Sequence, residues 1–235
     1  MKWLMLLLSF FYNPAPTPIP LTAKGLIIPH HLAAESSIKS ALHTFQSQSA
    51  SPSSIIFIAP NHKEVGNAFI ISDKPSIIGS MASVLYNSAI VNQEHAVTDS
   101  VPLINQYFPN IPIIPIILSS RLPYDQLLSL VQILAKTSDK NILIIGSIDF
   151  SHYLSLAEAD SYDQATLGLI QTHNYSMIRS LDNRSVDAPQ VLETVMRTMD
   201  DVGAKNIEVL SHTNSGRLSG NPVAPTTSHF TLQFK

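Results

Sequence analysis

The sequence predicts an α/β fold, a three-layer α/β/α sandwich around a largely parallel central sheet. From Lys24 onward, short apolar runs rich in β-branched residues alternate with longer stretches of helical periodicity, the pattern of strands joined by helices. Most of these runs are unbroken by polar residues, as in strands that helices cover on both faces. A chain of 235 residues is long enough for one sizeable core, and we expect a single domain over residues 23–235.

Seven segments have the strand pattern of short, mostly unbroken apolar runs. In chain order they are Leu26–Pro29, Ser54–Ala59, Ala68–Ser72, Ile113–Leu118, Asn141–Ser147, Asn206–Ser211 and Ser228–Phe234. Their alternation with helical segments favours parallel strands joined by crossover helices.

Six longer segments between these strands have the helical pattern. Pro123 and Pro189 each begin one of them, at a position where proline is tolerated because its missing N–H would be unpaired in any case. Asp187, just before Pro189, has the character of an N-cap residue. The stretch from Ser211 to Pro222 is polar and rich in turn residues, so we expect a loop there. The six predicted helices are Ala33–Gln48, Ser76–Asn87, His95–Gln106, Pro123–Thr137, Leu156–His173 and Pro189–Val202.

Composition excludes several functional classes. The chain has no cysteine, which excludes disulfides, thiolate metal ligands and cysteine nucleophiles, so any bound metal must be held by histidine, carboxylate and water. The formal net charge is −3 and no run of Lys or Arg occurs, so we expect no nucleic acid as a partner. The sequence contains no Gly-x-Ser-x-Gly elbow and no phosphate-binding glycine loop, which argues against a serine hydrolase or a nucleotide-binding protein.

The N-terminus differs in character from the rest of the chain. Lys2 precedes an apolar block, Trp3–Tyr12, and a proline-rich stretch follows over residues 13–20. This order is typical of a secretory signal or leader, and the block is short for a membrane span, which needs roughly 20 residues. A first core strand before a rigid linker is the alternative. We expect residues 1–22 to be a leader and linker, which favours export or membrane tethering over a cytoplasmic location, with membrane contact only through this segment.

Three histidines follow predicted strands. His30 comes after Leu26–Pro29, His62 ends the string that begins at Ile55, and His152 closes the motif after the strand at Asn141–Ser147. In an open α/β sheet, ligands bind outside the carboxyl ends of the strands. A single histidine in such a place is often structural, but three in equivalent places predict that their side chains converge on one metal or acid–base site.

Several short strings occur in an order that is typical of one family. They are Pro29-His30, Ala59-Pro-Asn-His62, Glu94-His95, Asp149-Phe-Ser-His152-Tyr153 and Asn214-Ser-Gly216. Together they resemble the Memo family, called AmmeMemoRadiSam system protein B in bacteria and archaea, and the resemblance extends from about Gly25 to Phe234. The Asp-Phe-Ser-His-Tyr string is the most specific part.

The resemblance implies a fold similar to the class III extradiol dioxygenases, which hold Fe(II) with two histidines and one carboxylate. It implies that His30 and His62 are metal ligands, that His152 is a further pocket histidine for acid–base catalysis, and that Asp149 is its neighbouring acid. It also implies that the pair Glu94-His95 starts a helix at the same pocket. Such a metal site leaves coordination positions open for substrate.

The third ligand is where this chain departs from the family. Aligned on Pro189, Ser185 stands where the family has a cysteine ligand, and Asp187 lies two residues later. Asp187 either supplies a carboxylate, which would restore a site suited to Fe(II), Mn(II) or Zn(II), or acts only as a helix cap. If Asp187 is only a cap, the pocket is a binding site without metal.

Three functions remain open from the sequence. The first is a non-haem metal-dependent oxidoreductase, with a divalent metal for which Fe(II) is the first choice and Cu or Zn are alternatives. The second is a non-catalytic binding or scaffold module that takes a small-molecule or peptide ligand in the same pocket. The third is a hydrolase that uses metal-activated water.

Overall fold

A computed structural model gives the structure of residues 23–74, 78–79, 81, 83–138 and 141–235. The predicted leader over residues 1–22 lies outside the described residues. No helix within the described ranges is long and apolar enough to cross a membrane.

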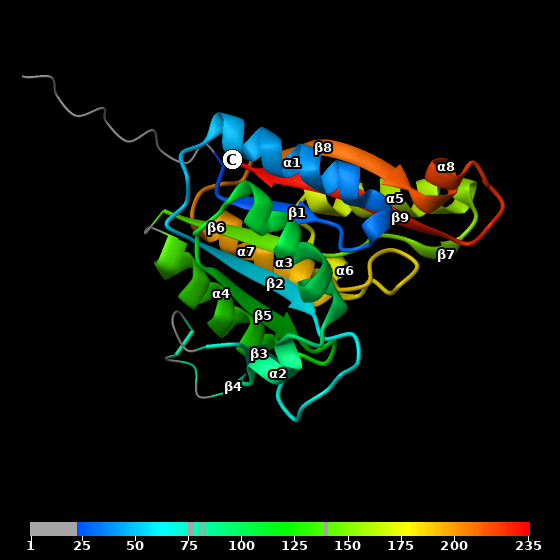
Figure 1. Cartoon of the computed structure of the whole chain (residues 1–235). Coiled ribbons are helices and arrows are strands. Elements are labelled where there is room, and N and C mark those ends of the chain that lie inside the picture. The colour runs from blue at the N-terminus through cyan, green and yellow to red at the C-terminus, as the bar shows by residue number, and fades with distance from the viewer. Residues whose placement is uncertain (1–22, 75–77, 80, 82, 139–140) are drawn as a thin grey trace, which may run out of the picture.

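A nine-stranded sheet forms the middle layer, in the order β4-β3-β5-β2-β6-β1-β9-β7, with β8 paired to β9 (Figure 1). The four central strands β5, β2, β6 and β1 are parallel, and β3 and β9 flank them antiparallel. The strands are β1 (Gly25–Ile28), β2 (Ser54–Pro60), β3 (Ile70–Ser72), β4 (Val84–Tyr86), β5 (Ile113–Leu118), β6 (Ile142–Ser147), β7 (His152–Leu154), β8 (Ile207–Asn214) and β9 (Thr226–Phe234).

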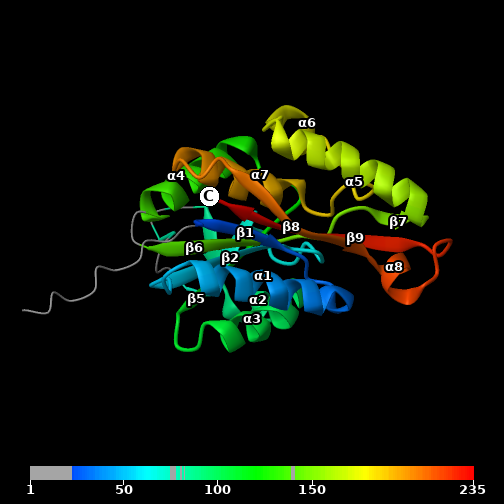
Figure 2. The ribbon, with the colours of Figure 1, turned by 90° about the horizontal axis from the view of Figure 1, so that it is seen from above.

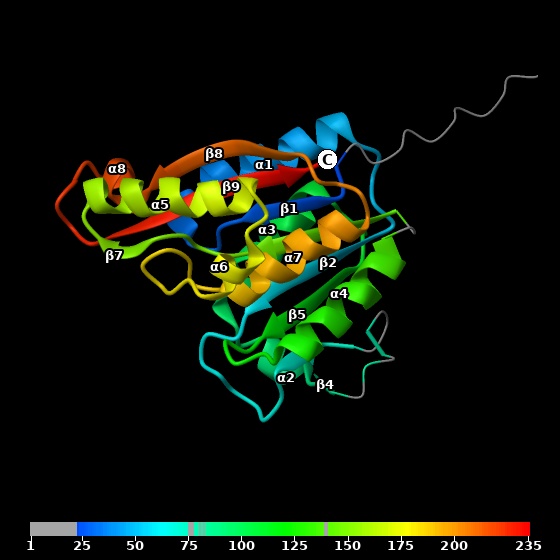
Figure 3. The ribbon, with the colours of Figure 1, turned by 180° about the vertical axis from the view of Figure 1, so that it is seen from behind.

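Helices cover both faces of this sheet. The helices α1 (Glu35–Gln48), α2 (Ser88–Val91) and α3 (His95–Tyr107) lie on one face (Figure 2). Figure 3 shows the other face, which carries α4 (Tyr124–Ser138), α5 (Leu156–Gln171), α6 (Tyr175–Arg179) and α7 (Pro189–Asp201). A short 3-10 turn, η1 (Leu32–Ala34), follows β1, and α8 (Ser215–Ser219) lies between β8 and β9. The α/β/α sandwich predicted from the sequence is therefore confirmed.

Burial on both faces explains the unbroken apolar runs. In β1, Leu26 and Ile28 pack into the apolar layer under α1 and α3, while Ile27 packs into the layer under α7. All four residues of this strand are buried. Because neighbouring side chains of a strand point to opposite faces, apolar residues are favoured at every position of a strand that is covered on both sides.

Several local predictions were wrong. The predicted helix Ser76–Asn87 contains the short strand β4, whose Val-Leu-Tyr sequence suits an edge strand better than a helix turn. The strand β7 was not predicted, nor were the short helices α2, α6 and α8. Part of the predicted loop after Ser211 continues β8, and Asn214 then begins α8 by accepting a hydrogen bond from the N–H of Arg217.

Candidate functional site

His30 lies two residues beyond β1, at the carboxyl end of the parallel strands. The side chain is almost fully buried, and Nδ1 lies 3.4 Å from Oγ of Ser147, the last residue of β6. Nε2 faces two carboxylates, with Oδ2 of Asp187 at 3.3 Å and Oδ2 of Asp149 at 3.5 Å. The His30 imidazole beyond the end of β1 thus faces the carboxylates of Asp149 and Asp187 with one ring nitrogen.

His62 lies two residues beyond β2 and is held by Glu94. The backbone N–H of His62 donates to Oε2 of Glu94 at 3.0 Å, and Nδ1 lies 2.7 Å from Oε1 of the same carboxylate. Nε2 of His62 lies 3.4 Å from Oδ2 of Asp187. Burial lowers the pKa of His62, but the nearby carboxylates of Asp187 and Glu94 outweigh burial and raise the pKa to about 9.

Glu94 and His95 begin α3 beside this histidine. Glu94 is the buried N-cap residue, and its side chain accepts a hydrogen bond from the N–H of Ala96. The His95 ring lies 4.1 Å from the His62 ring between centroids. One ligand atom from each of His30, His62 and His95 lies within 4.8 Å of the others, so this triad has the spacing to hold a metal ion.

Asp187 completes this group from the loop before α7. Its Oδ1 accepts a hydrogen bond from the backbone N–H of Asp149, and the N–H of Asp187 donates to the carbonyl of Asp149 in return. Oδ2 is buried and accepts no hydrogen bond from the described part of the chain, although it faces His30 and His62. The N-cap of α7 is Ala188, so the expected helix cap is not the role of Asp187. Ser185 is buried and is not among the residues that line the pocket in front of the histidines.

Asp149 is the second carboxylate that faces Nε2 of His30. This residue follows β6, and its Oδ1 lies 3.1 Å from Nδ1 of His229, a fully buried residue of β9. Burial raises the pKa of the Asp149 carboxyl, but the neighbouring His30 and His229 more than compensate and hold it well below its usual range. Asp149 is therefore an anion that orients two imidazoles.

The histidines open into a pocket of about 480 Å³. His152, the first residue of β7, lines this pocket, and its Nδ1 is buried without a hydrogen-bond partner among the described residues. Tyr153 follows at the mouth, 76% exposed and with a left-handed backbone at φ 62°. The full lining comprises His30, His31, Leu32, His62, His95, Asp99, Asp149, His152, Tyr153 and Thr227.

Sequence reasoning missed two histidines of this region. His31 lines the pocket and stacks on His229 with ring centroids 5.4 Å apart, although in an extended segment the residue after His30 would point away from the site. The alternation of a strand does not apply to His31, because β1 ends at Ile28 and His31 caps the turn η1. His229 lies inside β9, and no local signal in the sequence marks its contact with Asp149.

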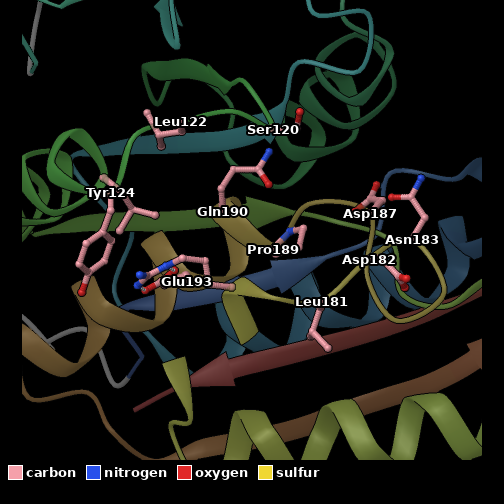
Figure 4. Close-up of a pocket in the computed structure, with 12 residues that line it drawn as sticks. Ser120, Leu122, Tyr124, Leu181, Asp182, Asn183, Asp187, Pro189, Gln190 and Glu193 are labelled. Atoms are coloured by element: carbon pink, nitrogen blue, oxygen red, sulfur yellow. Dashed lines mark hydrogen bonds and ion pairs between the residues drawn. The ribbon is translucent and has the colours of Figure 1, made fainter. Parts of the chain in front are cut away.

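Asp187 lines a second cavity, of about 270 Å³, between α4 and α7 (Figure 4). Figure 4 places Asp187 beside Asn183 at one end of this cavity, with Tyr124 and Glu193 at the other end. Asp187 therefore lines this cavity while its Oδ2 faces His30 and His62.

Two sequence comparisons with known proteins agree on one family, and a structural comparison shows a shared fold. The sequence model of the family described as Memo-like protein matches residues 77–225. A MEMO1 family protein of Thermotoga petrophila is 24% identical over 197 residues, which cover 72% of this chain and 68% of that protein. The crystal structure of the uncharacterized protein JW3007 from Escherichia coli K12 has a TM-score of 0.64 at 13% identity, over 90% of this chain and 99% of that one, which shows a shared fold.

Proposed function

This chain belongs to the Memo family, and we propose that it is a metal-dependent oxidoreductase that holds a divalent metal ion with Nε2 of His30, Nε2 of His62 and Oδ2 of Asp187. One observation carries the proposal. Oδ2 of Asp187 is buried, accepts no hydrogen bond within the described residues, and lies 3.3 and 3.4 Å from the two imidazole nitrogens. A buried carboxylate oxygen is costly unless a cation satisfies it. Protonated His30 and His62 face this oxygen in the metal-free protein, and a bound metal ion would take the place of their protons.

The two distances from Oδ2 of Asp187 fit a metal site. With ligand bonds of about 2.1 Å, neighbouring ligand atoms lie roughly 3.0–3.4 Å apart at octahedral to tetrahedral angles. The two measured separations from Asp187 fall at the upper end of this range. The Glu94 carboxylate beside Nδ1 of His62 is the outer partner that metal-binding histidines commonly have.

The donor atoms limit the metal. Two imidazoles and one carboxylate suit Fe(II), and also Mn(II), Zn(II) or Cu(II), and no thiolate is present in the chain. When bound, the metal would supply Lewis-acid and redox chemistry with positions left open for substrate. His95 is the neighbouring candidate for a further ligand, because it belongs to the triad of closely spaced histidines.

The other pocket residues have separate tasks in this proposal. His152 lines the same pocket and has a buried, unpartnered Nδ1, so it can exchange a proton with a substrate bound there. Ser147 lies 3.4 Å from Nδ1 of His30, the ring nitrogen that would not bind the metal, and Asp149 is a further carboxylate beside this ring that is itself held by His229. Thus one group of side chains would hold the metal, and a different histidine would move the proton.

Metal analysis of the purified protein tests the proposal. We expect about one equivalent of a first-row divalent metal per chain after reconstitution, lost in Asp187→Asn and retained in the matched variant Ser185→Ala. If Asp187→Asn retains the metal and His95→Gln loses it, the ligands are His30, His62 and His95, and the Asp187 carboxylate is not one of them. If the folded protein binds no metal, the pocket is a small-ligand or peptide site, and the oxidoreductase proposal is wrong.

A further inference from the structure

The second cavity has a cationic end that lies outside the proposed metal site. Its walls come from the loop after β5, from α4, from the chain between α6 and α7, and from the first turns of α7. Its apolar lining includes Leu122 above Tyr124, Pro189 between the Glu193 and Asp187 ends, and Leu181 below Pro189 (Figure 4). The cavity thus has apolar side chains along its length and different polar groups at its two ends.

Arg179 is the cation at the Glu193 end. Its Nε donates to Oε2 of Glu193 at 2.9 Å and its Nη2 donates to Oε1 at 2.5 Å, while the guanidinium lies 3.5 Å above the ring centre of Tyr124. This pairing uses the Nε–Nη2 edge of the guanidinium, and the Tyr124 side chain is its other polar neighbour. The Nη1–Nη2 edge, which Glu193 leaves free, has the geometry that binds a carboxylate through two parallel hydrogen bonds.

Glu193 is shared by two guanidinium groups. It is completely buried and also accepts a hydrogen bond from Nε of Arg197 at 2.7 Å, but of the two arginines only Arg179 lines the cavity. Two more acids line the cavity. The carboxylate of Asp187 faces His30 and His62, and Asp182 lies at the opposite end from Glu193, where it accepts a hydrogen bond from the N–H of Arg184.

Gln190 adds a free acceptor between the two ends. The residue is only 9% exposed, and its Nε2 donates to the carbonyl of Leu118 at 3.3 Å. Its side-chain oxygen accepts no hydrogen bond from the described part of the chain, although Gln190 lines the cavity. An acceptor in the wall of a cavity can take a hydrogen bond from an O–H or N–H group of a bound ligand.

We propose that this cavity binds a small organic acid whose carboxylate pairs with the free edge of Arg179, whose apolar body lies on Leu122, Leu181 and Pro189, and whose hydroxyl or amino group donates to Gln190. The volume of about 270 Å³ is near the lower end for small-molecule sites, which suits a single-ring or short-chain acid. Binding at this site does not depend on a metal.

Titration calorimetry with two matched probes tests the proposal on the full-length protein after metal removal. We expect 4-hydroxybenzoate to bind at least about tenfold more tightly than its uncharged analogue 4-hydroxybenzamide, because only the acid pairs with Arg179. Arg179→Gln should lose this preference. Arg197→Gln removes the other guanidinium from Glu193 but does not line the cavity, so it should keep the preference.

A second variant keeps the test decisive if Arg179→Gln does not fold. Gln190→Glu introduces a negative charge into the cavity without altering Arg179, and it should weaken binding of the acid at least about tenfold. Equal affinity for the two probes, equal loss in Arg179→Gln and Arg197→Gln, or no binding of the acid at millimolar concentration would overturn the proposal. None of these results bears on metal binding by Asp187, which is measured separately.

Discussion

Nδ1 of His62 lies 2.7 Å from Oε1 of Glu94, a residue 32 positions later in the chain. The loop after β2 and the first residue before α3 are joined by this contact and by the bond from the backbone N–H of His62 to the same carboxylate. Because Nδ1 is occupied by an acceptor, the ring turns Nε2 toward Asp187. The helix start therefore determines which nitrogen of His62 is available to a metal.

Replacing Glu94 by Gln should weaken metal binding about 10–100-fold, the effect usual for loss of a carboxylate behind a histidine ligand. The substitution keeps the shape of the side chain but removes the charge that orients and polarises the His62 ring. Chelator competition on the reconstituted protein measures the change. The matched control is Glu208→Gln, which removes a carboxylate from the exposed pair with Lys235. If Glu94→Gln binds metal as tightly as Glu208→Gln, His62 does not bind metal through Nε2.

The metal-free protein should lose stability as the pH rises through about 9. The pKa of His62 is raised from an ordinary value of 6.5 to about 9 in the folded state. Protonation of His62 therefore contributes its full stabilisation of the fold below pH 6.5, and this contribution is lost as the pH rises through about 9. The charges that face it are Glu94 and Asp187, with His30 and His95 as neighbouring imidazoles. We expect a loss on the order of 2 kcal/mol, after allowance for solvent screening of a partly exposed ring.

Urea unfolding between pH 6 and pH 10 measures this loss, and His62→Gln provides the reference. In His62→Gln the free energy of unfolding should change much less between pH 6.5 and pH 9. An identical pH profile in the two proteins would show that His62 is not protonated in the folded state near neutral pH.

Asp149→Asn should destabilise the protein by about 3–5 kcal/mol, because it removes one partner from a buried ion pair. The carboxylate is nearly inaccessible and faces His229 at 3.1 Å and His30 at 3.5 Å. Chemical denaturation gives the free energy of unfolding. Asp160→Asn is the matched control at an exposed pair with Arg217, where a loss below about 1 kcal/mol is expected. Equal losses in the two variants would mean that Asp149 carries no special electrostatic role.

The placement of His30 and His62 could be predicted because it follows from sheet geometry alone. Both residues come after strands of the parallel centre, and the carboxyl ends of parallel strands meet at one edge. The sequence pattern does not give strand direction where the chain folds back. For that reason the antiparallel β8 and β9 were not distinguished from the rest, and the contact of His229 with Asp149 was not foreseen.

The orientation of Asp187 depends on contacts between distant segments. The bridge between Phe150 and Val186 and the paired bonds between Asp149 and Asp187 hold the loop before α7 against the end of β6. A local pattern of Asp followed by Ala-Pro fits a helix cap equally well, so the sequence left both roles open. The pairing of Arg179 with Glu193 is likewise a side-chain contact between two helices, which no periodicity encodes.

The end of β6 carries Ser147 and Asp149 into the site, and Gly146 makes the close packing of that strand possible. A Cβ at Gly146 would lie 2.7 Å from Cδ1 of Ile27 and 2.8 Å from Cγ2 of Val195, both fully buried. Gly146→Ala should therefore destabilise the protein by about 1–3 kcal/mol, the usual cost of overpacking a filled core. It should also weaken metal binding, since a shift of β6 moves Asp149 and the loop that it holds.

Gly168→Ala is the contrasting change, because nothing lies within 4 Å of its Cβ position in α5 and alanine favours the helix. That variant should gain up to about 1 kcal/mol. Thermal and urea unfolding of both variants measure the difference, and a Gly146→Ala protein as stable as the parent would show that Ile27 and Val195 can move aside without cost.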